Sequence, residues 1–179
     1  NSILGSGTVN SPRIGIRGYF SFTHYIAANK FAELAKELET EDVTSDNLEL
    51  HKAYVVSTII SAVAFIEAAI NEVLKDAFEN HHVHISSLDQ RAKELLTVFW
   101  KITEEDQRYV KVLAKYQTTL YLIGGESAEF DKGNATFERV KLLIDLRNLL
   151  THYKPATDWL DDDNDLERRI RNQKIDENF

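Results

Sequence analysis

The scarcity of helix-breaking residues is the feature that most constrains how this chain folds. No glycine occurs between Tyr19 and Ile123, and no proline occurs between Arg13 and Lys154. Glycine and proline are the residues that destabilise a helix interior most. A chain that lacks both over most of its length is therefore predicted to form long helices.

Apolar periodicity divides this length into five expected helices. Within each of them apolar residues recur at helical spacing, which places them on one face. No stretch alternates apolar and polar residues in the way that a half-buried strand does. The sequence therefore predicts an all-α protein, an antiparallel bundle of about five helices. The expected helices cover approximately residues 19–39, 45–79, 88–100, 104–123 and 134–154.

Residues with known preferences at helix ends set these boundaries. Ser45 and Ser87 are suitable N-caps for the second and third helices. The glycine pair 124–125 ends the fourth helix and opens a polar loop that extends to the region of Asn134. The fifth helix is expected to stop before Pro155, because a residue that precedes proline is disfavoured in the helical conformation.

The composition indicates one globular domain, with 43% hydrophobic and 28% charged residues in a chain of 179. We expect an N-terminal extension (1–18), the helical bundle (19–155) and an acidic C-terminal tail or short helix (156–179). The absence of cysteine excludes disulfides and thiolate metal sites, and it fits a reducing compartment such as the cytoplasm. The strongly apolar stretch without charge, 53–66, is too short to span a bilayer, so no membrane contact is expected.

The second expected helix is apolar on two of its sides. A helix of this kind must bury both sides. We therefore expect it to contact its own bundle and a second copy of the chain, which predicts a homodimer. One side carries Val56, Ile59, Val63, Ile66, Ile70, Val73 and Ala77, and the other carries Val55, Ala62, Phe65 and Ala69.

A group of polar residues lies near the C-terminal end of the fifth expected helix, in the segment DLRNLLTHYKP. Arg147 projects into the same arc as the aliphatic residues Val140 and Leu143, where a guanidinium needs a partner. Asn148 and His152 are four residues apart and therefore share a face. The three residues form an R-N-x-x-x-H arrangement beside an apolar surface.

Glu67 is an acid in the most apolar part of the second helix, and Asn71 follows it by four residues. An ion pair between Glu67 and Arg147 would explain a charge in this position. Such a pair either orients a catalytic arginine, with Asn71 in support, or is a plain salt bridge, and the sequence leaves both open.

The arrangement on the last long helix resembles the HEPN family, an all-α superfamily whose members share R-N/D/H-x-x-x-H at this place in a helical bundle. The resemblance covers about residues 19–154 and includes the segment SAVAFIEAAINEVL, which is similar to the family's second major helix. It implies a HEPN-like fold and a metal-independent endoribonuclease of the toxin or defence type. It also implies that two protomers place both copies of the motif in one cleft, and that an antitoxin or regulatory protein restrains the activity.

The resemblance assigns a role to each residue of the motif. His152 would accept the proton of a ribose 2′-OH, Arg147 would stabilise charge on the phosphate, and Asn148 would orient the site. No metal or cofactor is implied, and the products would carry a 2′,3′-cyclic phosphate and a 5′-OH. Many HEPN toxins have a tyrosine two residues after the histidine. Here Lys154 takes that place, so control by tyrosine modification is not expected, and Tyr153, which follows His152 directly, is expected to support the site.

Charge limits where RNA can bind. The net charge of −8 argues against a surface that grips nucleic acid everywhere. Residues 138–154, however, hold four basic side chains against two acids. Besides Arg147 these are Arg139, Lys141 and Lys154, which are the expected RNA contacts.

Two alternatives to a nuclease remain open. One is a non-catalytic HEPN-like module that binds RNA, a nucleotide or a protein, and the other is a helical dimerisation scaffold without a ligand. A structural ion pair at Arg147 would fit either. The histidines at 81, 82 and 84 follow a helix, an ordinary place for them, and no further metal ligand is spaced to join them.

Overall fold

The computed structural model describes residues 17–40, 44–105, 110–125, 128–131, 133–152 and 165–172, and the regular elements among these are all helices. The all-α prediction is confirmed, with five substantial helices and a short sixth helix in the acidic tail. Tyr153 and Lys154 lie outside the described residues. The helices are α1 (Ser21–Leu38), α2 (Ser45–Glu79), α3 (Gln90–Glu105), α4 (Val112–Gly124), α5 (Ala135–Thr151) and α6 (Asp165–Arg171).

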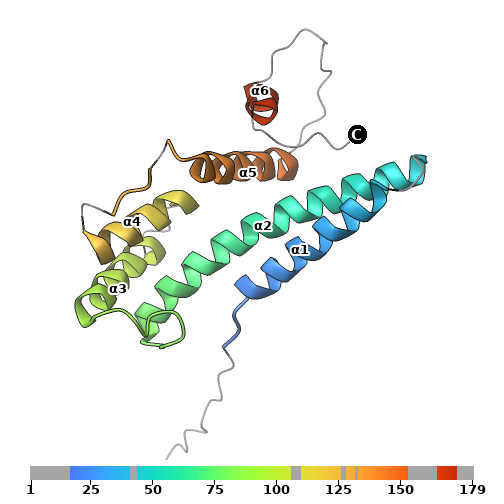
Figure 1. The fold of residues 1–179 in the computed structure, drawn as a ribbon. Helices are drawn as coiled ribbons and strands as arrows, with labels where there is room; N and C mark the ends of the chain where they lie inside the picture. Colours follow the sequence, from blue (N-terminus) through green and yellow to red (C-terminus); the bar gives the residue numbers. More distant parts are fainter. Residues whose placement is uncertain are drawn as a thin grey trace, which may run out of the picture.

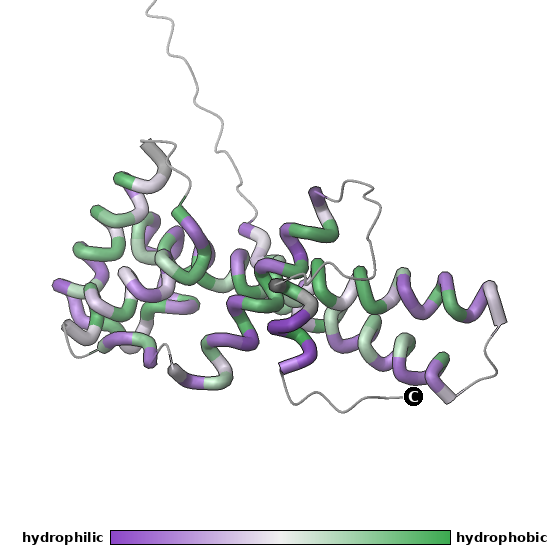
Figure 2. Tube along the Cα trace, turned by 90° about the horizontal axis from the view of Figure 1, so that it is seen from above, coloured by the Kyte–Doolittle hydropathy of each residue, from purple (hydrophilic) through white to green (hydrophobic). Residues whose placement is uncertain are grey.

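The helix α2 is the axis around which the others are arranged. It lies side by side with α1, and α3 and α4 gather around its C-terminal half (Figure 1). The helix α5 packs on α2 and carries α6 on its other side. In two perpendicular views, α1 and the N-terminal half of α2 extend as a two-helix arm away from α3 and α4 (Figures 1 and 2).

The apolar core lies where α2, α3 and α4 meet. Leu74 of α2, Leu96 of α3 and Ile85 of the connecting turn are completely buried, and Trp100 closes the cluster. The core therefore occupies one end of the molecule rather than its middle. This explains why α5 meets α2 on a partly exposed surface, where polar side chains are accommodated.

The two-sided apolar character of α2 leaves part of its surface uncovered within one chain. Among the described residues, α2 is the one helix whose length and composition would allow it to cross a membrane, and only 11% of its most apolar stretch is buried. Core helices of soluble proteins pass the same test. Glu67, which is ion-paired with Arg147, lies in this stretch, and a charge at the centre of a bilayer is costly. The absence of membrane contact therefore stays a prediction.

Two predicted N-caps are wrong by one or two residues. Thr44, not Ser45, caps α2, and its side chain accepts a hydrogen bond from the Asn47 backbone N–H at 3.1 Å. At α3 the Asp89 carboxylate accepts a bond from the Ala92 backbone N–H at 2.7 Å, so Ser87 is not the cap. In both places the sequence offers neighbouring residues that can cap a helix.

The predicted boundary between the third and fourth helices is also wrong. The helix α3 continues through Glu105, and α4 begins at Val112 instead of near Glu104. Val112 is buried, so the first turn of α4 is set by its place in the core. No glycine or proline marks this break in the sequence, and tertiary packing therefore decided it.

Gly125 ends α4 in a conformation that residues with a Cβ rarely adopt, with φ of 73° and ψ of −168°. A Cβ at this position would meet no atom within 4 Å. Gly125→Ala is therefore expected to lower the free energy of unfolding by about 1–3 kcal/mol through backbone strain alone. Urea denaturation monitored by circular dichroism measures this; an unchanged midpoint would show that the turn relaxes.

Candidate active site

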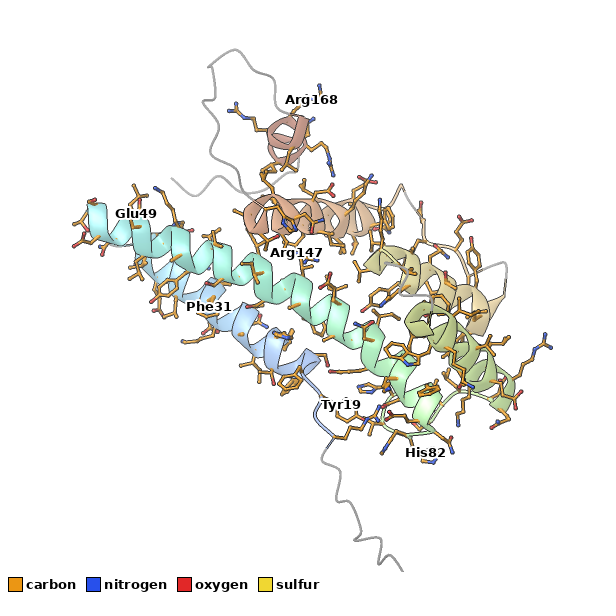
Figure 3. All side chains as sticks on the ribbon, turned by 180° about the vertical axis from the view of Figure 1, so that it is seen from behind. Tyr19, Phe31, Glu49, His82, Arg147 and Arg168 are labelled. Carbon is orange, nitrogen blue, oxygen red and sulfur yellow. The ribbon has the colours of Figure 1, made fainter. Side chains whose placement is uncertain are left out.

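Arg147 of α5 lies against α2 and is ion-paired with Glu67 through its Nη2 atom. Figure 3 shows Arg147 between the two helices. Both side chains are partly exposed, Arg147 by 21% and Glu67 by 35%. The expected pairing of these two residues is therefore present. It ties α5 to α2 and fixes the direction of the guanidinium.

The guanidinium of Arg147 is not fully used by this pair. Its Nε–H group is buried and has no hydrogen-bond acceptor among the described residues. An unmet donor in a buried position carries a free-energy cost. Because Nε is buried, a ligand from outside the chain does not reach this donor while α5 is packed on α2, and only the exposed part of the side chain, 21%, is accessible to an anion.

His152 and Asn148 emerge at the C-terminal end of α5, and both are exposed. His152 is the C-cap, and its backbone N–H donates to the Asn148 carbonyl at 3.1 Å. Within the described part of the chain, the imidazole makes no hydrogen bond or ion pair. The ring is therefore accessible to a ligand and has a free nitrogen to exchange a proton.

A cleft of about 420 Å³ lies between the N-terminal part of α4 and α5, and neither Arg147 nor His152 lines it. Asn148 lines it, together with Lys141 and Lys111. Of the expected RNA contacts, Lys141 thus borders a cavity next to the motif. Arg139 is exposed but does not line this cleft, and Lys154 is not described.

Asn71, expected to support the site, lies one turn beyond Glu67 on α2. Its Oδ1 atom accepts a hydrogen bond from the Lys115 ammonium of α4 at 2.8 Å. Asn71 therefore joins α2 to α4 and is not in contact with Arg147. Its part in the structure is to hold α4 against the same helix that positions Arg147.

A second polar cluster, which sequence reasoning missed, surrounds Asp76 near the end of α2. The Asp76 carboxylate is completely buried and accepts bonds from Arg17, from the Tyr19 hydroxyl at 2.9 Å and from the His84 backbone N–H at 3.2 Å. His84 Nδ1 lies 2.7 Å from the same carboxylate and donates to it, since a carboxylate only accepts. In the sequence Asp76 follows Lys75 and stands between Glu72 and Glu79, so it does not stand out from an apolar stretch as Glu67 does.

Glu72 of the same helix caps the start of α1. Its carboxylate accepts bonds from the backbone N–H groups of Phe20 at 2.6 Å and Ser21 at 2.9 Å. The α1 N-cap residue has no capping side chain of its own. Glu72 therefore satisfies donors that the helix leaves unpaired and places a negative charge at the positive end of α1. The cluster around Asp76 and Glu72 thus joins α1, α2 and the turn after α2.

Among the residues that the structure describes, no group of three histidine or acidic side chains is placed to hold a metal ion. Comparisons of the chain with models of known protein families, with curated proteins and with solved structures find no match. What this chain does is therefore inferred from its own residues: the motif on α5, its carboxylate partner on α2 and the cleft between α4 and α5.

Proposed function

We propose that this protein is a metal-independent endoribonuclease of the HEPN toxin or defence type. The observation that carries the proposal is the combination at one end of α5: an exposed imidazole on His152, a guanidinium on Arg147 that Glu67 holds in place, and an open cleft at Asn148. These are the groups that cleavage of a ribose-phosphate backbone requires without a metal.

In the proposed reaction the imidazole of His152 accepts the proton of a ribose 2′-OH. The 2′ oxygen attacks the adjacent phosphorus, and the 5′ oxygen leaves with a proton from solvent. Arg147 donates hydrogen bonds to the phosphate oxygens, where negative charge builds up in the transition state. The products carry a 2′,3′-cyclic phosphate and a 5′-OH, and Asn148 orients the sugar or phosphate beside the histidine.

The proposal includes a homodimer in the cytoplasm. The two-helix arm exposes large apolar side chains, including Phe22 and Ile26 of α1 and Ile60 of α2. Exposed apolar surface of this kind is typical of protein contacts. An antitoxin or regulatory partner is part of the same proposal.

A second candidate function is a non-catalytic HEPN-like module that binds RNA, a nucleotide or a protein. The ion pair between Arg147 and Glu67 favours it, because the guanidinium already has a partner inside the chain. The two candidates differ in what His152 does. In a binding module the imidazole transfers no proton. The wild type and a variant without His152 would then both fail to cleave RNA.

The test is cleavage of an unstructured RNA in EDTA by the wild type and by His152→Ala. Loss of a general base is expected to slow cleavage by about 10²–10⁴-fold. His82→Ala, which removes an exposed histidine outside the motif, is the matched control and should cleave at the wild-type rate. Equal cleavage by wild type and His152→Ala would assign the activity to a contaminant and contradict the proposal.

A further inference from the structure

Two neighbouring cavities form a groove along α4 and α5. The cleft at Asn148 shares Leu113 and Phe137 with a second cavity of about 400 Å³ that lies further from the motif. We infer that this groove is the path of the RNA strand, and that the second cavity is a pocket for one unstacked base. The inference rests on the proposed function and identifies where its substrate binds.

The walls of the second cavity suit a nucleobase. Aromatic rings from three segments line it: Tyr116 of α4, Phe137 of α5 and Phe130 of the loop between them. The Phe130 and Phe137 rings are 5.7 Å apart and tilted by 47°. Unpaired bases are commonly recognised by stacking on aromatic side chains. The volume is at the lower end of the range for ligand pockets, which fits one base rather than a larger ligand.

Polar groups stand at the rim of this pocket, and its walls are held in place. Asp131, Asn134 and Thr136 line it beside the aromatic rings, where their side chains can meet the edge of a base. The Gln117 side chain accepts a bond from the Phe130 backbone N–H at 2.9 Å and donates to the Ala128 carbonyl at 3.1 Å. The loop wall is therefore fixed to α4 before a ligand arrives.

Charge along the groove matches a phosphate backbone. Lys111 and Lys141 line the cleft between the base pocket and Asn148, and in the described part of the chain neither ammonium is ion-paired. Glu138 and Asp145 border the same cleft, and Arg169 of α6 pairs with Asp145 at 2.9 Å. With Asp145 paired, the cleft holds two ammonium groups against the one carboxylate of Glu138, which is a small local excess of positive charge in a chain of net charge −8. The order along the groove is base pocket, lysine cleft and then Asn148, the one motif residue that lines either cavity.

The experiment measures binding of a fluorescent 2′-O-methyl oligonucleotide, which cannot be cleaved, by anisotropy. Thr136→Trp fills the pocket from its exposed rim without removing a core contact. We expect it to weaken binding about tenfold, the loss of one stacked base. Ala135→Trp, at the neighbouring exposed position outside both cavities, is the control and should bind as the wild type does.

A second oligonucleotide, which carries abasic sites, tests whether the affinity lost in Thr136→Trp comes from a bound base. Its affinity for the wild type should fall about tenfold, and Thr136→Trp should cause no further loss. The inference would be overturned if Thr136→Trp and Ala135→Trp bound the intact oligonucleotide equally well. It would also be overturned if the abasic sites weakened binding to these two variants by the same factor. Because binding is measured without cleavage, a wild type that fails to cut RNA but shows this pattern contradicts the proposed activity alone.

Discussion

Asp76→Ala is expected to be the most destabilising single substitution in this chain, with a loss of about 3–5 kcal/mol in the free energy of unfolding. The carboxylate is completely buried, and its removal leaves His84 Nδ1 without its acceptor and Arg17 paired with Glu79 alone. It also frees the Tyr19 hydroxyl and so loosens the start of α1 from α2. Chemical denaturation gives the value directly.

The same residue makes stability depend on pH in a defined direction. Burial alone would raise the pKa of Asp76, but the hydrogen bonds from His84 and Tyr19 and the charge of Arg17 outweigh it and lower this pKa. A lowered pKa stabilises the fold above the pKa of an unfolded aspartate, about 3.9, and this stability is lost as pH falls through the folded-state value. Asp76→Asn should flatten the acid limb of the stability curve.

Glu49→Gln is the matched control for Asp76. It removes a carboxylate that pairs with Lys52 on the surface of the same helix, where the side chain is 71% exposed. A pair in this position is screened by solvent, so the substitution should leave both the midpoint and the acid limb unchanged. If Asp76→Ala unfolded at the same denaturant concentration as Glu49→Gln, the buried cluster would not hold α1 and α2 together.

Arg147→Ala is expected to lower the rate of RNA cleavage by about 10²–10³-fold, the usual effect of removing one donor that stabilises a transition-state oxyanion. Arg147→Lys should rescue only a small part of the rate, since lysine keeps the charge but loses the planar fork. The ion pair with Glu67 is partly exposed, so both variants should retain the wild-type thermal unfolding midpoint within a few degrees.

Arg91→Ala is the control for Arg147, because Arg91 is an exposed arginine on α3, away from α5. Its cleavage rate should equal that of the wild type. Glu67→Gln should give an intermediate rate, since the amide still accepts a hydrogen bond but no longer carries the charge that fixes the guanidinium. Full activity in Arg147→Ala would remove the arginine from the reaction and favour a structural ion pair.

Periodicity was sufficient to predict the main helices, because few residues in the chain disturb the helical pattern. The start of α5 at Asn134 and the end of α4 at Gly125 were also predictable from local chemistry, a side-chain acceptor in one case and a positive φ in the other. The break between α3 and α4 was not. Glu105 and Val112 both suit a helix, and only the burial of Val112 in the core decides where α4 begins.

Part of the candidate site was predictable from the sequence, and part of it was not. The contact between Arg147 and Glu67 was predictable, because a charge on an apolar helix face needs a partner and each helix offers one. The cluster at Asp76 was missed, since its partners Arg17, Tyr19 and His84 lie outside the helices of the structure, in segments whose contacts helical spacing does not predict. Long-range contacts of irregular segments depend on the folded arrangement, which local spacing does not encode.

The chemistry of the RNA ends tests the central claim most directly. An RNA oligonucleotide is incubated in EDTA with the wild type and with His152→Ala, and the products are identified by mass spectrometry. The wild type should give 2′,3′-cyclic phosphate and 5′-OH ends, and His152→Ala should give at least about a hundredfold less of both, the effect of removing one general base. Intact RNA with the wild type, or products with 5′-phosphate ends, would contradict the claim.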